Sequence, residues 1–359
     1  MHTLSINVGS SSLKIDLWDV ARGEHLFAEA ARGLSLHPEE PPTDHLRALG
    51  DLLARIALSI DRVGHRIVHG GPDHQQAVWV DAMVLGELDA LSPLSPVHLP
   101  PALAVLRRAR ELLPEAAHAA VFDTAFHAGL PPRAREYALP ARWREQGIRR
   151  YGFHGLACED IVAELGAALR QRAVVLHLGA GCSATALEHG RSVDTTMGMT
   201  PLAGLVMASR SGDVDPGALV YLLRRGESAE SLDRTLNHES GLLGLSGISG
   251  DMQDLLEQID APEAALAVDV FCYQAAKAVA ALAVPLGGIE HVIFSGGIGE
   301  HAAPIRAAIG ERLAWLGLEL DAAANAEHAA CISSARSRVA VHVVRIDESR
   351  AIARRTAEL

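Results

Sequence analysis

The stretch INVGSSSLKI, from Ile6 to Ile15, begins as an apolar strand, breaks at a glycine followed by three serines, and returns as a second strand that carries a lysine. Backbone N–H groups and serine hydroxyls can donate to the same anion, so this composition is typical of a phosphate-binding turn. The P-loop pattern is missing, and the residues after the serines alternate like a strand. Ser10, Ser12 and Lys14 are two apart and therefore project from one face of the returning strand. We predict a strand–turn–strand that faces a phosphate; the alternative is a solvated hairpin with a lysine that binds nothing.

The same pattern recurs in AVVLHLGAGCSATALEHGRSVDTT, from Ala173 to Thr196. An apolar strand again leads into a Gly-x-Gly-x-Ser turn and a second apolar strand, and a turn at Gly190 then leads into a third strand. The first copy continues in the same way through DVARGEHLFAEA. We therefore predict a duplicated domain, in which each copy begins with a phosphate-facing hairpin.

Helical stretches with a 3.6-residue apolar period alternate with short apolar strands such as HAAVFDTAF and HVIFSGGIG. This alternation predicts two α/β domains. The expected N-terminal lobe comprises residues 1–124 plus 347–359, and the expected C-terminal lobe comprises residues 125–346. Helices are predicted at His45–Ile56, Pro101–Leu113 and Glu159–Arg172.

The composition excludes several classes of partner. The 359 residues are 49% apolar with a net charge of −12, so we expect a large core and no bulk attraction for nucleic acid or anionic membranes. Aromatic residues, at 4%, are too few for base-stacking platforms. The four cysteines lack a C-x-x-C pair, which favours a reduced cytosolic protein. His65 and His69 could share a strand face, but they lack an evident third ligand, so the pair does not predict a metal site. The chain does not start like a signal peptide, and its most apolar region, Ala275–Gly299, predicts a buried helix, a turn and a strand rather than a membrane span.

Polar residues gather where the apolar strands end. Asp123 follows the strand AAVF, at the edge where α/β sheets bind ligands, and the glycines of Ser295–Glu300 let a ligand approach the backbone. Arg66 and Arg210 each lie close to glycines that would allow a guanidinium to reach a phosphate. Taken singly, each arginine has the alternative of a solvated loop residue. Together with the two hairpins, these residues predict phosphoryl transfer between two hinged lobes.

Seven motifs run nearly from end to end: NVGSSSLK, GHRIVHGG, VFDTAFH, IRRYGFHG, HLGAGCS, DTTMGMTPLAGLVMASRSGDVDP and FSGGIGE. By these motifs the chain resembles the acetate/propionate kinase family, within the actin and sugar-kinase superfold. The resemblance implies two actin-like (ribonuclease H-like) domains with a cleft between them, and in-line transfer from ATP to acetate, or propionate, to give an acyl phosphate and ADP. It also implies a requirement for Mg²⁺, which Mn²⁺ can replace, and a cytoplasmic homodimer with its contacts in the C-terminal lobe.

The resemblance implies roles for single residues at the reacting centre. Arg66, Arg210 and His154 match positions that stabilise charge on the transferred phosphoryl group and orient the carboxylate. Asp123 matches an essential aspartate that positions the arginine and the metal. That role agrees with the chemistry, because a carboxylate substrate is already ionised and needs no base. A buried core histidine is the alternative for His154.

Other positions match residues that contact ligands. Asn7 and Glu348 match residues that hold the magnesium shell, and a hard cation prefers such oxygen ligands, often through water. Phosphate or ATP contacts are implied at Ser10, Ser12, Lys14, His177, Gly179, Ala180, Gly181, Asp251, Gly297, Ile298, Gly299 and Glu300. The pocket for the short acyl chain is implied at Val68, Val97, Phe153 and Pro201, next to Arg66. Plain core positions remain the alternative for the two valines.

The chain departs from the family pattern on the nucleotide side. Ala180 and Cys182 stand in a turn that is usually Gly-Asn-Gly, Gln253 stands where an arginine is usual, and His301 stands where an asparagine is usual. These differences leave donor choice and nucleotide affinity open. Two alternatives follow: the same fold with pyrophosphate or another phosphoryl donor, and a catalytically idle protein that binds a nucleotide or an acyl phosphate.

Overall fold

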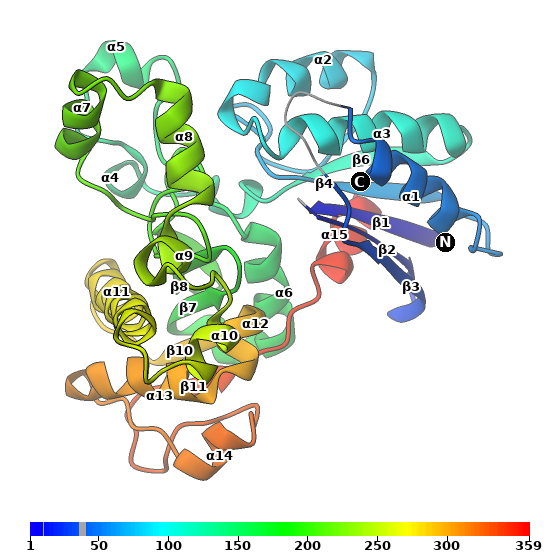
Figure 1. Cartoon of the computed structure of the whole chain (residues 1–359). Helices are drawn as coiled ribbons and strands as arrows, with labels where there is room; N and C mark the ends of the chain where they lie inside the picture. Colours follow the sequence, from blue (N-terminus) through cyan, green and yellow to red (C-terminus); the bar gives the residue numbers. More distant parts are fainter. Residues whose placement is uncertain (10, 36–40) are drawn as a thin grey trace. The chain divides into compact units, whose positions relative to one another are not determined.

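The computed structural model describes residues 1–9, 11–35 and 41–359, so Ser10 of the first hairpin lies outside the described residues. These residues form two units, each built around one β-sheet (Figure 1). The first unit comprises Met1–Ala128, Phe153–Asp160 and Asp347–Leu359. The second comprises Gly129–Gly152 and Ile161–Ile346.

The units differ from the expected lobes in two stretches. Residues 125–128 and 153–160, which were expected in the C-terminal lobe, group with the first unit. The backbone N–H of Gly155 donates to the carbonyl oxygen of Asp123 at 3.0 Å, and Asp160 binds the C-terminal segment. Tertiary hydrogen bonds therefore draw these residues to the first sheet.

The first sheet has the strand order β3-β2-β1-β4-β6-β5. Strands β1, β2 and β3 pair antiparallel, whereas β1, β4 and β6 run parallel and β5 pairs antiparallel with β6. The predicted hairpin forms from β1 and β2, with Gly9 opposite Ser12. The strands are β1 (His2–Gly9), β2 (Ser12–Asp19), β3 (Glu24–Arg32), β4 (Arg62–Ile67), β5 (Val78–Trp79) and β6 (Ala117–Phe122).

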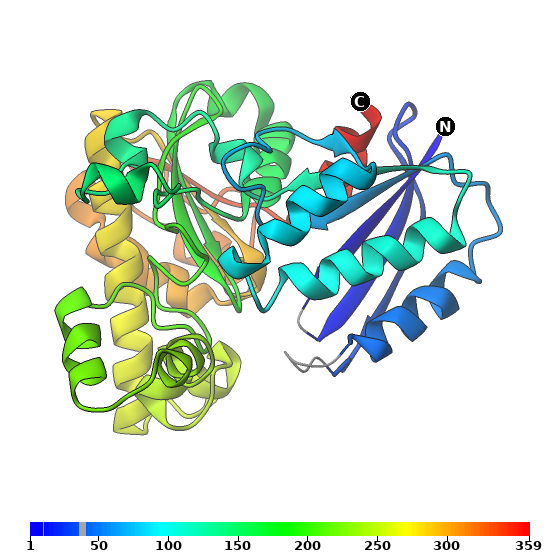
Figure 2. The same cartoon turned by 90° about the horizontal axis from the view of Figure 1, so that it is seen from above.

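Helices cover this sheet on its two faces (Figure 2). One face buries alternate residues such as Ile6 and Ile15 against Leu49 of α1 (Thr43–Leu53) and Val105 of α3 (Leu99–Leu112). The other face carries α15 (Glu348–Ala357), which approaches so closely that a Cβ at Gly64 would lie 2.7 Å from Ile352. Helix α2 (Ala82–Ala90) and the 3₁₀ turns Ser92–Leu94 and Ala125–His127 complete the unit.

The second sheet repeats the arrangement of the first. Its order is β11-β10-β7-β8-β9, with β7, β8 and β9 antiparallel and β7, β10 and β11 parallel. Three antiparallel strands followed by two parallel ones match β3-β2-β1-β4-β6, which confirms the predicted duplication. The strands are β7 (Arg172–Leu178), β8 (Cys182–Glu188), β9 (Arg191–Thr195), β10 (His291–Ser295) and β11 (Ala340–Val343).

One prediction about a helix was too long. Helix α6 spans Gly155–Leu165, and the chain then continues as a 3₁₀ segment, Gly166–Arg170, before β7 begins. The α-helix ends where Gly166 takes a φ of +48°. The remaining helices are α4 (Pro132–Arg135), α5 (Ala141–Arg144), α7 (Pro216–Arg224), α8 (Ala229–His238), α9 (Gly241–Ser246), α10 (Met252–Glu257), α11 (Pro262–Leu286), α12 (Gly296–His301), α13 (Ala303–Arg312), α14 (Ala322–Ala326) and the 3₁₀ turn Ala314–Leu316.

Helix α11 is long and apolar enough to span a membrane by length and composition. It packs along β7, β8 and β9 with buried residues that include Phe271 and Val279 (yellow in Figure 1). It ends at Gly287, whose φ of +66° turns the chain toward β10. The predicted succession of helix, turn and strand in this region is confirmed.

Candidate functional site

Four polar side chains meet at one end of the first sheet. Asn7 and Arg66 lie near the carboxyl ends of the parallel strands β1 and β4, and Asp123 directly follows β6. Glu348 is the first residue of α15, which crosses the same sheet. Parallel strands bring their carboxyl ends to one edge, so residues far apart in the sequence become neighbours there.

Arg66 is the centre of this cluster. Its Nε donates to Asp123 Oδ1 at 3.0 Å and its Nη2 to Asp123 Oδ2 at 2.7 Å, a bidentate pair. Its Nη1 donates to Asn7 Oδ1 at 3.0 Å and lies 3.3 Å from Glu348 Oε2. Asn7 Nδ2 closes the ring by donating to Glu348 Oε2 at 2.8 Å. The guanidinium is therefore held from three sides, and its side chain is 17% exposed.

Burial shapes the charges of the cluster. Burial by itself would lower the pKa of Arg66. The negative charges of Asp123 and Glu348 outweigh that effect, so the pKa of Arg66 lies above its ordinary value. Burial raises the pKa of Asp123, which is 1% exposed, and the opposing attraction of Arg66 does not cancel that effect. Arg66 thus remains a cation at any working pH. Both carboxylate oxygens of Asp123 accept hydrogen bonds from it.

An ion pair between the buried Asp160 and the partly exposed Arg350 helps to hold the start of α15, the helix whose first residue is Glu348. The Asp347 carboxylate accepts from the N–H groups of Ser349 and Arg350 and so caps α15 at its start. Asp160, which has no exposed surface, accepts from Arg350 Nε at 2.8 Å and from the Asp347 backbone N–H at 2.7 Å. No local sequence pattern marks Asp160 as a site residue, because it lies within a predicted helix and its partners are almost 190 residues away in the sequence.

The loop that carries His154 lies against Asp123. Gly152 and His154 have φ values of +77° and +57°, so the chain bends sharply before α6. A Cβ at Gly155 would lie 2.1 Å from the Asp123 carbonyl oxygen, so only glycine allows this approach. Phe153 is 1% exposed, and its carbonyl accepts from His127 Nε2 at 3.0 Å. The structure therefore brings His154 and Phe153 to the same end of the sheet as Asp123.

The first hairpin presents its polar side chains to the face that carries Glu348. Lys14 pairs with Asn7 in the strand register, and Leu13 and Ile15 point to the opposite, buried face. Ser12 is half-buried and Lys14 is exposed, as expected for side chains that reach toward a ligand. Ser10 lies outside the described residues.

The remaining predicted substrate contacts divide between the units. Val68 follows β4 and Val97 precedes α3, and both are half-buried in the first unit. Arg210 and Pro201 belong to the second unit, where Arg210 Nη1 donates to the Pro201 carbonyl at 2.9 Å. The structure brings these two residues together in one loop region.

The second unit contains a cavity of about 600 Å³ beside its hairpin turn. The cavity brings together five of the twelve predicted phosphate and ATP contacts, namely Gly179, Ala180, Asp251, Gly297 and Ile298. The three departures Ala180, Gln253 and His301 all line the same cavity. The positions that differ from the family pattern thus surround one space, although they are far apart in the sequence.

Other predicted nucleotide-side residues lie beside this cavity rather than in its wall. His177 Nδ1 is 3.3 Å from Ser295 Oγ, and Gly299 packs on Phe294. Glu300 accepts from the Gly296 N–H at 3.2 Å. The expected turn at residues 297–300 is the short helix α12, because Gly296, at a φ of +75°, lets the chain enter a helix directly after β10.

Cys182 does not enter the cavity. It is fully buried, and its Sγ donates to the Gly179 carbonyl at 3.2 Å. Burial raises the pKa of this thiol to about 12, so it stays protonated. Ala180, by contrast, is exposed.

The first cluster offers hard oxygen ligands for a cation. In the part of the chain that the structure describes, no group of three or more His, Cys, Asp or Glu side chains is arranged to hold a metal alone. Asp123, Glu348 and Asn7 provide two carboxylates and one amide around one guanidinium, which leaves a net charge of −1. Such a set fits Mg²⁺, which keeps several waters and takes other ligands from phosphates. His65 is engaged elsewhere, in a hydrogen bond with His118.

Comparisons with known proteins agree in pointing to one family. The profile of the Acetokinase family matches residues 44–354. An acetate kinase from Rhizobium meliloti is 43% identical over 388 aligned residues, which cover 99% of this chain and 98% of that protein. An acetate kinase from Micrococcus luteus is 44% identical, with 100% and 99% covered. The crystal structure of a propionate kinase from Francisella tularensis has a TM-score of 0.90 at 32% identity and covers 100% of this chain and 99% of that one.

Proposed function

Because this chain belongs to the Acetokinase family, a family of phosphotransferases that act on a carboxyl group, we propose that it transfers the γ-phosphoryl group of ATP to acetate or propionate. The products would be an acyl phosphate and ADP. The observation that carries the proposal is the Arg66 guanidinium, held by Asp123, Asn7 and Glu348 at the carboxyl ends of the parallel strands.

The geometry supports direct transfer without a general base. A carboxylate substrate is ionised at neutral pH, so no proton has to be removed before it attacks. Asp123 has both oxygens committed to Arg66, which is the arrangement of a positioning group rather than of a base. Arg66 would stabilise the negative charge that spreads over the transferred phosphoryl oxygens. Arg210 and His154 remain predicted contacts of that group.

Asn7 and Glu348 are the residues that would hold Mg²⁺, with Asp123 close by. The metal would neutralise phosphate charge and fix the phosphates of the nucleotide. Glu348 is suited to this because its carboxylate is 16% exposed and is fixed by Asn7 and Arg66. Mn²⁺ would fit the same oxygen ligands.

On the second unit, we place the nucleotide in the cavity beside Gly179 and Asp251. Its volume of about 600 Å³ is suitable for a nucleoside, since small-molecule sites commonly measure roughly 300–1,000 Å³. Backbone N–H groups of the Gly179–Gly181 turn would face the phosphates of this nucleotide. Free thiols at all four cysteines support a reducing, cytoplasmic location.

The test is direct. Purified protein with ATP, MgCl₂ and acetate should form an acyl phosphate that hydroxylamine converts to a hydroxamate. Propionate is expected to react as well, since one methylene in an apolar pocket changes specificity by only about 1–3 kcal/mol. Absence of product with acetate, propionate and butyrate, alongside an active acetate kinase as reference, would refute the proposal.

Pyrophosphate or another phosphoryl donor in place of ATP is the alternative, and the three departures from the family pattern motivate it. Ala180, Gln253 and His301 line one cavity, so the departures would act on the nucleotide together. Rates with ATP, GTP and pyrophosphate at a fixed acetate concentration distinguish ATP from another donor. A higher kcat/KM with pyrophosphate than with ATP would identify pyrophosphate as the preferred donor. Nucleotide binding without turnover by any donor would instead identify a binding protein.

A further inference from the structure

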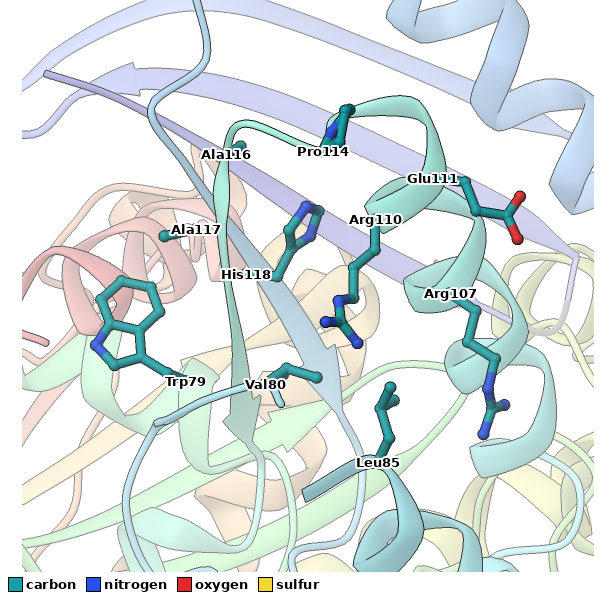
Figure 3. A pocket seen from close by; sticks show the side chains of 10 residues that line it. All are labelled: Trp79, Val80, Leu85, Arg107, Arg110, Glu111, Pro114, Ala116, Ala117 and His118. Atoms are coloured by element: carbon teal, nitrogen blue, oxygen red, sulfur yellow. The ribbon is translucent and has the colours of Figure 1, made fainter. Parts of the chain in front are cut away.

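A second cavity of about 620 Å³ lies in the first unit, away from the cluster around Arg66 (Figure 3). Residues of the edge strand β5, the start of β6, helix α2 and the end of helix α3 line it. His118 in its wall is near the start of β6 and Asp123 directly follows the end of that strand, five residues or about 16 Å away along an extended chain. The cavity is therefore separate from the site described above.

The end of α3 supplies this cavity with one uncompensated positive charge. Arg107 pairs with Asp89, and Arg108 pairs with Glu111. Arg110 is half-buried, and among the described residues no carboxylate pairs with it. In Figure 3 its guanidinium points from α3 into the space beside Leu85. A half-buried cation without a counter-ion is costly, and a bound anion would offset that cost.

The histidine at the wall adds no charge. His118 Nε2 lies 3.1 Å from the Leu113 carbonyl oxygen, so this nitrogen carries the proton. His118 Nδ1 must then accept from His65 Nε2, at 3.0 Å. Burial lowers the pKa of both imidazoles, and the charge of Arg110 lowers them further. Protonating His118 would break this chain of hydrogen bonds, so the uncompensated positive charge of the wall is that of Arg110.

Besides Arg107, Arg110, His118 and Glu111, whose carboxylate pairs with Arg108, the wall is apolar and includes a partly exposed indole. Val80, Leu85, Pro114 and Ala116 line the cavity, and Trp79 on β5 is 37% exposed. The guanidinium of Arg62 lies 5.4 Å from the centre of the Trp79 ring. A flat apolar group placed against this wall would cover the exposed part of the indole, and aromatic contacts favour such packing.

We propose that this cavity is a binding site for a small organic anion, with a carboxylate or phosphate group on Arg110 and a flat apolar body against Trp79. Its volume matches that of small-molecule sites, which are mostly apolar with a few polar groups that fix orientation. The proposal does not depend on the proposed kinase activity, because every residue that carries it belongs to the other end of the sheet.

Calorimetric titration of the full-length protein tests the site with phenyl phosphate and phenylacetate as probes. Phenylacetamide, which has the same body without a charge, should bind much more weakly than phenylacetate. Loss of a hydrogen bond to a charged group should make both anions bind about ten- to a hundredfold more weakly to Arg110→Gln. Arg108→Gln is the matched control, because Arg108 is on the same helix but outside the cavity, and it should leave both affinities unchanged.

Two further arms keep the test decisive if Arg110→Gln folds poorly. Ala117→Phe should fill the cavity and abolish binding of both anions, and Arg110→Lys should retain part of the affinity because it keeps the charge. Saturating acetate and a non-hydrolysable ATP analogue should not displace the probes. Tight binding of only one of the two probes supports the site and selects its head group.

The proposal falls if neither anion binds, if Arg110→Gln binds both as well as the native protein does, or if the acetate and ATP analogue displace them. The last result would place the anions in the catalytic cluster. These outcomes are separate from the hydroxamate assay, which should give the same rate for Arg110→Gln and the native protein without added probe.

Discussion

At the scale of single residues, the site depends on side chains that cannot be exchanged for similar ones. The Arg66 guanidinium donates to Asp123 through two nitrogens and to Asn7 through a third. A lysine is a point charge and cannot satisfy three acceptors in one plane. Replacing Arg66 also leaves Asp123 buried at 1% exposure without a counter-charge. Function and stability are thus coupled at this position.

Arg66→Ala is expected to reduce kcat on the order of 10³-fold, about 4 kcal/mol of transition-state stabilisation. It should also lower the free energy of unfolding by roughly 3–5 kcal/mol, because a buried partner loses its ion pair. Steady-state kinetics and urea titration measure the two effects, with the exposed Arg47→Ala as control. Retention of more than a tenth of the native kcat would remove Arg66 from its proposed role.

Ala180→Asn should strengthen ATP binding. The side chain at this position is exposed and borders the proposed nucleotide cavity, so an amide there can donate to a phosphate. One such hydrogen bond to a charged group is worth about 1.5–3 kcal/mol, and KM for ATP should fall about ten- to a hundredfold while KM for acetate stays constant. Cys182 is turned away from the cavity, so the single substitution should suffice, and Cys182→Ala should leave KM for ATP unchanged. An unaltered KM for ATP in Ala180→Asn would mean that the turn binds phosphate through its backbone alone.

At the scale of elements, the start of α15 determines where Glu348 lies. The helix is capped by Asp347, and the Asp347 backbone is bound by Asp160, which also pairs with Arg350. These contacts fix the backbone position from which the Glu348 side chain extends. The helix start, rather than the glutamate alone, is therefore the positioning device.

Asp160→Asn should weaken the contacts that hold the start of α15. Arg350 is about one-third exposed and water can compensate part of its charge, so we expect a loss of about 1–3 kcal/mol in the free energy of unfolding. The concentration of Mg²⁺ that gives half-maximal rate should rise. Arg355→Gln is the matched control. Like Arg350, Arg355 is on α15 and pairs with a carboxylate, Glu159, but it is farther from Glu348. A rise in the Mg²⁺ requirement that is equal in both variants would indicate general destabilisation instead of positioning.

At the scale of the whole molecule, one helix of the second unit has an apolar surface without a cover. None of the α7 residues is buried, and Val220, Tyr221, Leu222 and Leu223 are 38–60% exposed. Contiguous exposed apolar residues of this kind mark interaction surfaces. We expect α7 to lie in the interface of a homodimer.

Tyr221→Glu combined with Leu223→Glu should convert the expected homodimer to a monomer, because two charges would have to be buried at its interface. Light scattering after size-exclusion chromatography measures the mass. Met83→Glu places the same charge on an apolar residue that is 68% exposed in the first unit, and it should leave the mass unchanged. A native protein that is already monomeric, or a double variant that stays dimeric, would exclude α7 from the interface.

Local sequence patterns determined both hairpins, the duplicated topology and the placement of Asp123 at a strand end. The reason is physical: alternation and glycine turns are encoded within a few residues, and parallel strands always present their carboxyl ends together. Tertiary structure alone decided that residues 153–160 join the first unit, that Asp160 holds the start of α15, and that Ala180, Gln253 and His301 share one cavity. It also decided that Arg110 is left without a carboxylate partner in the described part of the chain, while Arg107 and Arg108 on the same helix are paired. Some of these contacts join residues that are distant in the sequence, and others depend on which face of a helix packs against its neighbours. A local sequence pattern determines neither.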